Sequence, residues 1–299
     1  MSYKEGLVHR RSEAIYSAEE FFLRKLPVKY EVLGLEYLVE IKRLLEEENN
    51  VFATPDHRSL ADTASGAVIT FKEKRAFGNL IHDAVFIISL KYLENKASDF
   101  FLKGINVIPM FSPTMEEDPR KKAVNWAGIR AVRDRRDGTL FIITPEAERN
   151  KTGKMQKARR ESSSFWHIKK NAYIFPIAFE ETEVQWPPGK KGALHYWIGG
   201  GMLHKMRVIL GKPIEVKKVD QIVNYLSQNY DGFDSKQLSV DMVMREVAIL
   251  HLTQGDKKYV EGSYYEDLMR DLADKNWLFL KPEELIKSSS SQNQGDQSS

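Results

Sequence analysis

A histidine and an aspartate five residues apart are the side chains best suited to chemistry. His57 and Asp62 follow the short apolar run at residues 51–54 and open an amphipathic stretch. Because sites in α/β proteins lie where strands end, we expect His57 in a turn and Asp62 in the first helical turn, folded back to the imidazole. Such a carboxylate fixes the tautomer of the ring and stabilises its protonated form. The pair predicts general-base catalysis at a hydroxyl group, a step to which a positioned histidine contributes ~10²–10⁴-fold.

The same residues also fit a structural role. Ser59 and Asp62 have the spacing of a helix cap, and the helix dipole favours a carboxylate in the first turn. The His-x4-Asp spacing recurs at His251 and Asp256, where an amphipathic helix leads into a polar loop. We interpret that second copy as a chance match, and the spacing alone leaves catalysis and capping both open.

Short β-rich runs alternate with longer amphipathic stretches through the middle of the chain. Strands are expected near residues 51–54, 85–90, 105–110, 139–144, 172–178 and 206–210. Helices are expected near residues 59–78, 93–103, 120–135 and 158–170. This alternation predicts an α/β fold whose mostly parallel, mixed central sheet is flanked by helices.

Helical additions are expected on both sides of this α/β domain, which we assign to residues 49–217. Residues 1–48 are predicted to be helical, with a capping box that begins at Ser17 and an interruption at Pro27. Residues 218–287 are predicted to form helices near 219–228, 236–252 and 263–273. Residues 288–299 are small and polar and are expected to be disordered.

Further segments follow the histidine in a definite order. They are the apolar run at 104–111, the segment 140–153, the run at 173–179 and a closing strand at 207–214. Together with residues 57–62, this series resembles the glycerolipid acyltransferase superfamily over about residues 50–215. Members of that superfamily acylate glycerol 3-phosphate or its 1-acyl derivative, with acyl-CoA or acyl carrier protein as the donor.

The resemblance implies a role for individual residues. His57 would be the general base and Asp62 its orienting partner, while backbone amides near the site would stabilise the oxyanion. Neither a cofactor nor a metal is implied, and the spacing of His57, Asp62, His82 and Asp83 is not that of a metal site. The substrate-binding residues that the resemblance implies are Glu146, Arg149, Lys91, Gly153 and Pro176.

Two departures from the family pattern leave the identity of the acceptor open. Ala147 and Glu148 stand where many members have Gly and Thr, and the arginine that usually ends the second segment is missing near Met110. The run at 149–160 offers a substitute, because it holds six basic residues and no acidic one. Arginine binds phosphate oxygens in a bidentate manner, so Arg149 is predicted to bind phosphate. The other basic residues, including the cluster at 120–122, are interpreted as a solvated or lipid-facing surface.

Composition excludes several other classes of protein. The chain of 299 residues contains no cysteine, which removes disulfides, Cys-ligated zinc and a thiol nucleophile. It has no G-x-S-x-G elbow, no phosphate-binding loop and no H-E-x-x-H motif. The net charge of only +3 gives no reason to expect a nucleic-acid partner.

The location follows from the predicted chemistry and from hydropathy. The N-terminal residues lack the apolar core of a signal peptide, and no apolar run approaches the ~20 residues of a spanning helix. We therefore expect a cytoplasmic protein that is peripheral at the inner face of the membrane, where its lipid substrate or product lies. A cluster of apolar residues suits either a membrane interface or ordinary core packing; it comprises Trp186, Leu194, Tyr196, Trp197, Ile198, Met202 and Leu203.

The expected function is thus an O-acyltransferase of phospholipid biosynthesis. Its partners would be acyl-CoA or acyl carrier protein, a glycerol phosphate or lysophospholipid acceptor, and the membrane surface. Two alternatives remain open from the sequence. One is an acyltransferase for another lyso-lipid acceptor, and the other is a catalytically silent protein that binds lipid or an acyl carrier.

Overall fold

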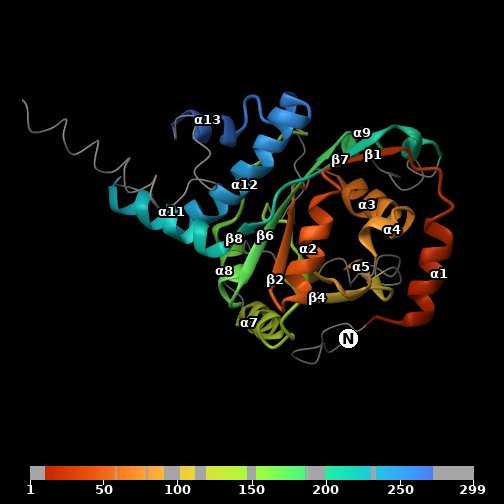
Figure 1. The fold of residues 1–299 in the computed structure, drawn as a ribbon, viewed down its shortest axis with the longest axis horizontal. Helices are drawn as coiled ribbons and strands as arrows, with labels where there is room; N and C mark the ends of the chain where they lie inside the picture. The colour runs from red at the N-terminus through yellow and green to blue at the C-terminus, as the bar shows by residue number, and fades with distance from the viewer. Residues whose placement is uncertain are drawn as a thin grey trace, which may run out of the picture.

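The centre of the molecule is an eight-stranded sheet, shown in Figure 1. The structure is a computed structural model that describes residues 11–57, 59–78, 80–90, 102–111, 119–146, 153–185, 187, 199–229 and 234–271. The strand order is β1 (Tyr30–Leu33), β7 (Met206–Leu210), β6 (Ala172–Glu180), β2 (Asn50–Pro55), β5 (Leu140–Ile142), β3 (Val85–Ser89) and β4 (Asn106–Met110), with β8 (Ile214–Glu215) paired to β6. Strand β6 is antiparallel to β7 and β8, whereas the other pairs are parallel. The expected α/β fold with a mostly parallel, mixed sheet is confirmed.

Helices cover both faces of this sheet (Figure 1). Helices α11 (Val216–Asn229), α12 (Ser235–Gln254) and α13 (Tyr264–Asp271) lie on one face, and α2 (Tyr37–Glu46) and α3 (Leu60–Lys72) lie on the other. The remaining helices are α1 (Glu13–Leu23), α4 (Lys74–Phe77), α5 (Leu80–Asp83), α7 (Pro119–Arg133), α8 (Ser163–His167) and α9 (Thr182–Gln185), with 3-10 turns at Arg160–Ser162, Gly201–Leu203 and Lys257–Tyr259. No helix among the described residues is long and apolar enough to cross a membrane.

Strand β2 separates the two hydrophobic cores. Phe52 packs in the core that contains α11 and α12, whereas Val51 and Ala53 pack in the core that contains α2 and α3. Successive side chains of a strand point to opposite faces, so one strand can contribute to both cores. The strand ends at Pro55, and the turn that carries His57 follows it directly.

Helix α12 is buried over most of its length. Every residue from Leu238 to Ala248 is buried, including the polar Asp241, Arg245 and Glu246. A helix surrounded by protein must pair its polar side chains internally, because water is not there to do so. Its last turn brings one such side chain, that of His251, to the sheet.

The N-terminal region differs from its prediction. Residues 1–48 were expected to be helical, but Tyr30–Leu33 forms β1 and pairs in parallel with β7 from Tyr30 and Met206 onward. This is an override of local pattern by tertiary pairing, because an edge strand gains its hydrogen bonds from a partner far along the chain. Helix α1 also begins at Glu13, not at Ser17, and it ends before Pro27 as expected.

Other element boundaries agree within a few residues, with one shortfall. The helix expected at 158–170 is only the turn Arg160–Ser162 followed by α8, which ends at His167. Asn171 has a positive φ of 52°, and the chain reverses there to enter β6. Most of the helix expected at 93–103, and the tail at 288–299, lie outside the described residues.

Candidate active site

His57 and Asp62 meet at the carboxyl end of β2. His57 follows the strand, Asp62 lies in the first turn of α3, and the His57 Nδ1 atom is 3.0 Å from the Asp62 Oδ2 atom. The predicted contact between the two side chains is therefore confirmed. Since the carboxylate engages Nδ1, the other ring nitrogen, Nε2, is the one available to a substrate.

Asp62 also organises the start of its helix. The backbone N–H of Ser59 donates to the same Oδ2 atom over 2.8 Å, and the N–H of Asp62 donates to the Ser59 carbonyl over 3.3 Å. The capping role and the orienting role are thus filled by one carboxylate at once. The Oδ2 atom of Asp62 thus contacts both the Ser59 N–H and the imidazole of His57, and the start of the helix holds it in that position.

Glu146 holds the same turn through the backbone. It follows β5, whose parallel pairing with β2 puts both carboxyl ends at one edge of the sheet. One carboxylate oxygen of Glu146 accepts the His57 backbone N–H over 2.6 Å, and the other accepts the Gln156 N–H over 3.0 Å. The side chain is only 1% exposed. Its observed contacts are therefore positioning contacts, and substrate binding by Glu146 stays a prediction.

The pair is buried but the histidine is not fully enclosed. The side chain of His57 retains 10% of its surface and that of Asp62 retains 4%. Burial removes competing water and strengthens the contact between the imidazole and the carboxylate. The arrangement can accept a proton at Nε2 and stabilise the resulting positive charge through Asp62, which is the function of a general base.

Two of the other predicted substrate-binding residues, Pro176 and Gly153, lie among the described residues. Pro176 lies in register with Thr54 and lines an open pocket of about 310 Å³ beside α12. Gly153 has a positive φ of 73° and lies near the Glu183 side chain. Lys91 and Arg149 lie outside the described residues.

Most described members of the basic run at 149–160 have protein partners. The Lys154 ammonium donates to the Glu261 carbonyl, Lys157 lies over the Tyr264 ring, and Arg160 pairs with Glu161 and Asp234. Arg159 differs: its guanidinium is half-buried, and no described side chain or backbone group pairs with it. Its backbone N–H donates to the Pro145 carbonyl over 2.9 Å. The backbone of Arg159 is therefore tied to the residue that precedes Glu146, and its side chain has no partner among the described residues.

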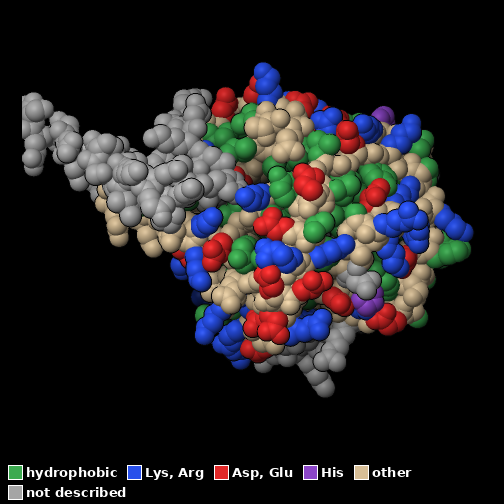
Figure 2. All heavy atoms as spheres, in the orientation of Figure 1, with side chains coloured by type: hydrophobic (Ala, Val, Ile, Leu, Met, Phe, Trp, Pro, Cys, Tyr) green, Lys and Arg blue, Asp and Glu red, His purple; other side chains and the backbone are tan. Residues whose placement is uncertain are grey.

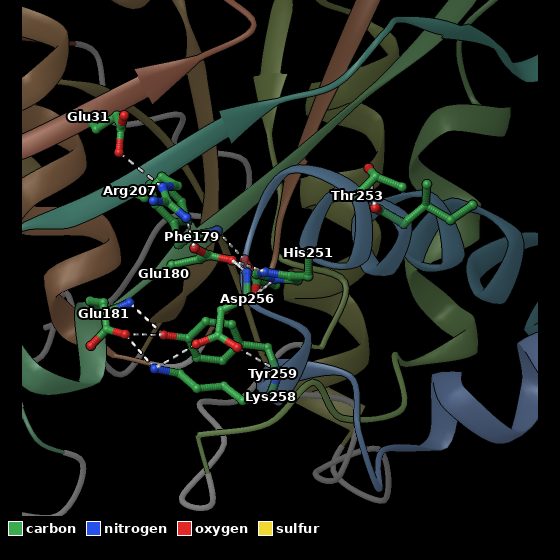
Figure 3. A network of polar contacts seen from close by, with 12 residues as sticks. Glu31, Phe179, Glu180, Glu181, Arg207, His251, Thr253, Asp256, Lys258 and Tyr259 are labelled. Carbon is green, nitrogen blue, oxygen red and sulfur yellow. Dashed lines mark hydrogen bonds and ion pairs between the residues drawn. The ribbon is translucent and has the colours of Figure 1, made fainter.

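A buried polar network that the sequence did not reveal lies on the α12 side of this turn (Figure 3). His251 does not contact the Asp256 side chain, although the spacing repeats that of His57 and Asp62. Its ring instead lies between Asp56 and Glu180. Interpretation of the spacing of His251 and Asp256 as a chance match did not predict the contacts of His251 with Asp56 and Glu180. The available signal was a second carboxylate, Asp56, directly before His57.

No metal site is evident in the part of the chain that the structure describes. None of its His, Asp and Glu side chains form a group of three or more that could hold a metal ion.

Fold and site together define an α/β protein with a His-Asp pair at the carboxyl edge of its sheet. Neither the protein-family models nor the curated protein sequences compared with the chain match it. The function must therefore be argued from the site.

Proposed function

We propose that the protein transfers a fatty acyl group from a thioester to a hydroxyl group of glycerol 3-phosphate or 1-acyl-glycerol 3-phosphate. The observation that carries this proposal is the 3.0 Å contact between His57 and Asp62 where β2 meets α3. The ordered segments that resemble glycerolipid acyltransferases support the choice of substrates. The donor would be acyl-CoA or acyl carrier protein, and the activity would belong to phospholipid biosynthesis.

The reaction is a direct transfer in a ternary complex. The Nε2 atom of His57 accepts the proton of the acceptor hydroxyl while its oxygen attacks the thioester carbonyl. The new C–O bond forms, the C–S bond breaks, and the imidazolium returns its proton to the leaving thiolate. Asp62 stabilises the charge that His57 holds between these two transfers.

Glu146 limits where the oxyanion can be stabilised. The backbone N–H groups of His57 and Gln156 already donate to its carboxylate. Other donors must therefore face the carbonyl oxygen of the thioester. Under this proposal Glu146 fixes the backbone of the general base, and Arg149 or Arg159 binds the phosphate of the acceptor.

A thiol-release assay with paired donors and acceptors tests the proposal. The wild-type protein should release thiol from a long-chain acyl-CoA or acyl carrier protein only when an acceptor is present. His57→Ala should abolish this release, whereas His167→Gln, on the exposed surface of α8, should leave it unchanged. Turnover near the wild-type rate in folded His57→Ala protein would reject His57 as the base.

The assay also separates the alternatives. Release with another lyso-lipid, but not with either glycerol phosphate acceptor, would assign a different acceptor class. Binding of the acyl donor without release for any acceptor would indicate a silent lipid- or carrier-binding protein. The intact contact between His57 and Asp62 favours a catalyst.

A surface beside α1 supports peripheral contact with a membrane at the cytoplasmic face. Phe21 and Phe22 are 57% and 66% exposed, and Leu203 is 45% exposed. Backbone hydrogen bonds between Lys29 and both Met202 and Met206 place the loop that follows α1 near Leu203. The exposed cations of this surface are Arg24, Lys25, Lys29 and Lys205. Figure 2 shows hydrophobic side chains beside Lys and Arg side chains over the α1 side of the molecule.

Apolar rings surrounded by cations suit an anionic lipid surface. The apolar cluster expected at 186–203 falls mostly outside the described residues; within it, Met202 is buried and Leu203 is exposed. The α1 surface, defined as Phe21, Phe22 and Leu203 with those four cations, is therefore the proposed membrane contact.

A further inference from the structure

Asp56, directly before His57, is tied to the opposite face of the sheet. Its carboxylate is fully buried. One oxygen accepts the Phe179 backbone N–H over 2.8 Å, and the other lies 3.1 Å from the Nε2 atom of His251. The residue that precedes the proposed base is therefore bonded to both β6 and α12.

His251 carries the link between α12 and this turn. Its side chain is 0% exposed, and its Nδ1 atom lies 3.0 Å from a carboxylate oxygen of Glu180. The ring therefore bridges two buried carboxyl groups, with Asp56 at one ring nitrogen and Glu180 at the other.

Glu180 extends this polar network toward the sheet edge, as Figure 3 shows. Its second oxygen pairs with Arg207 over 3.2 Å, and Arg207 pairs with Glu31 over 3.1 Å. Burial acts to raise the pKa of Glu180, but hydrogen bonds from His251 and from the Asp256 backbone hold that pKa below its ordinary value. The ionised state of Glu180 is therefore favoured.

The turn of His57 is held from three directions. Asp62 on α3 holds the imidazole from one face of the sheet, and His251 on α12 holds Asp56 from the other. Glu146, after β5, holds the backbone N–H between them. A shift of about 1 Å in a reacting group costs on the order of 10²-fold in rate, so each contact bears on catalysis.

We propose that His251 is a positioning residue, which acts through Asp56 to keep His57 at the acceptor hydroxyl. This inference rests on the proposed acyltransferase function. The charged and titratable groups that face the His251 ring are Asp56, Glu180, Tyr259 and Asp256.

The substitution His251→Gln tests the contact between His251 and Asp56. The amide of glutamine can donate hydrogen bonds only from its nitrogen, so its oxygen would face one of the two carboxylates that the imidazole now contacts. We expect kcat to fall about 10–100-fold with KM for both substrates within about threefold. His167→Gln is the matched control, since His167 makes a surface ion pair with Asp220 and lies on α8. Folding is checked by circular dichroism and thermal unfolding.

A second readout does not depend on activity. In protein labelled at the histidine rings, the NMR signals of His57, assigned with His57→Gln, should shift in His251→Gln and stay in place in His167→Gln. If wild-type protein shows no thiol release, the proposed function fails and this comparison alone decides the link. A folded His251→Gln protein with unchanged kcat, or with unchanged His57 signals, overturns the inference.

Asp56→Asn keeps the test decisive if His251→Gln does not fold. The amide is nearly isosteric, can still accept the Phe179 N–H, and replaces the carboxylate oxygen that faces His251 with an amide nitrogen. The expected result is again a lower kcat with shifted His57 signals. Wild-type kcat and unshifted signals in folded Asp56→Asn protein would reject the positioning role.

Discussion

The backbone N–H of His57 donates to a carboxylate oxygen of Glu146 over 2.6 Å, so the residues that follow β2 and β5 hold each other in place. The other oxygen of Glu146 accepts the Gln156 N–H. One buried carboxylate thereby joins three segments of the chain. The glutamate contacts His57, the proposed general base, only through the main chain in the contacts described, so we predict an effect on turnover and not on acceptor binding.

Glu146→Gln should lower kcat about 10–100-fold, because an amide can accept only one of the two N–H groups and turns its own donor toward the other. The KM for the acceptor should change less than kcat. Glu161→Gln is the control, since Glu161 lies on the surface and pairs with Arg160. A rise in acceptor KM at constant kcat would instead assign Glu146 to direct substrate contact.

Asp62→Asn distinguishes orientation of the imidazole from capping of the helix. Asparagine can still accept the Ser59 N–H, so the start of α3 and the thermal stability should be retained. The amide cannot stabilise an imidazolium as a carboxylate does, and kcat should fall ~10²–10⁴-fold. Steady-state thiol release measures this change. A loss below about fivefold would leave capping as the main role of Asp62.

Arg159→Gln should raise the KM for the acceptor about tenfold, while the KM for the donor stays constant. The reason is the loss of a hydrogen bond to a charged group, which contributes roughly 1.5–3 kcal/mol, and a change of about tenfold lies at the lower end of that range. Arg159 is half-buried, its backbone N–H donates to the Pro145 carbonyl, and its side chain has no partner among the described residues. Arg160→Gln is the matched control, because the neighbouring Arg160 is exposed and pairs with two acidic residues. Equal effects of the two substitutions would count against a phosphate contact at Arg159.

Phe21→Ser with Phe22→Ser should weaken binding to vesicles that contain anionic lipid by at least about tenfold, since burial of a phenylalanine contributes about 1.5–3 kcal/mol. Co-sedimentation measures the binding. Trp126→Ser is the control, because Trp126 is 60% exposed on α7, outside the α1 surface. Undiminished sedimentation of the double variant would exclude the α1 surface as the contact.

Glu19→Gln should change how stability depends on pH. Burial raises the pKa of Glu19 from 4.5 to about 7, and its carboxylate lies against Gly104. Because the pKa is higher in the folded state, the stability from protonation is fully present below pH 4.5 and is lost as the pH rises through about 7. Glutamine avoids this loss, so the variant should be about 1–2 kcal/mol more stable at pH 8 and little changed near pH 4.5.

Urea unfolding at the two pH values checks the stability prediction for Glu19. The exposed Glu36 provides the control substitution Glu36→Gln, whose effect should be the same at both. Equal stability of wild-type and Glu19→Gln protein at pH 8 would contradict a buried, strained carboxylate.

The alternation of apolar runs in the sequence predicted the α/β sheet, because hydrophobic periodicity records which faces are buried. The same reasoning failed for β1, since Tyr30–Leu33 becomes a strand only by pairing with β7. Near neighbours were easier to predict. His57 and Asp62 are five residues apart, so a turn and one helix start are enough to bring them together.

What the sequence by itself determined is thus the fold class and a histidine placed beside an aspartate where a strand meets a helix. Only the tertiary structure decided which distant groups hold that histidine. Asp56 and His251 are 195 residues apart, and their contact exists because α12 packs against the face of the sheet to which Asp56 points. Local spacing records periodicity and turns but not which buried polar groups will meet, so the partner of His251 could not be derived from its spacing to Asp256.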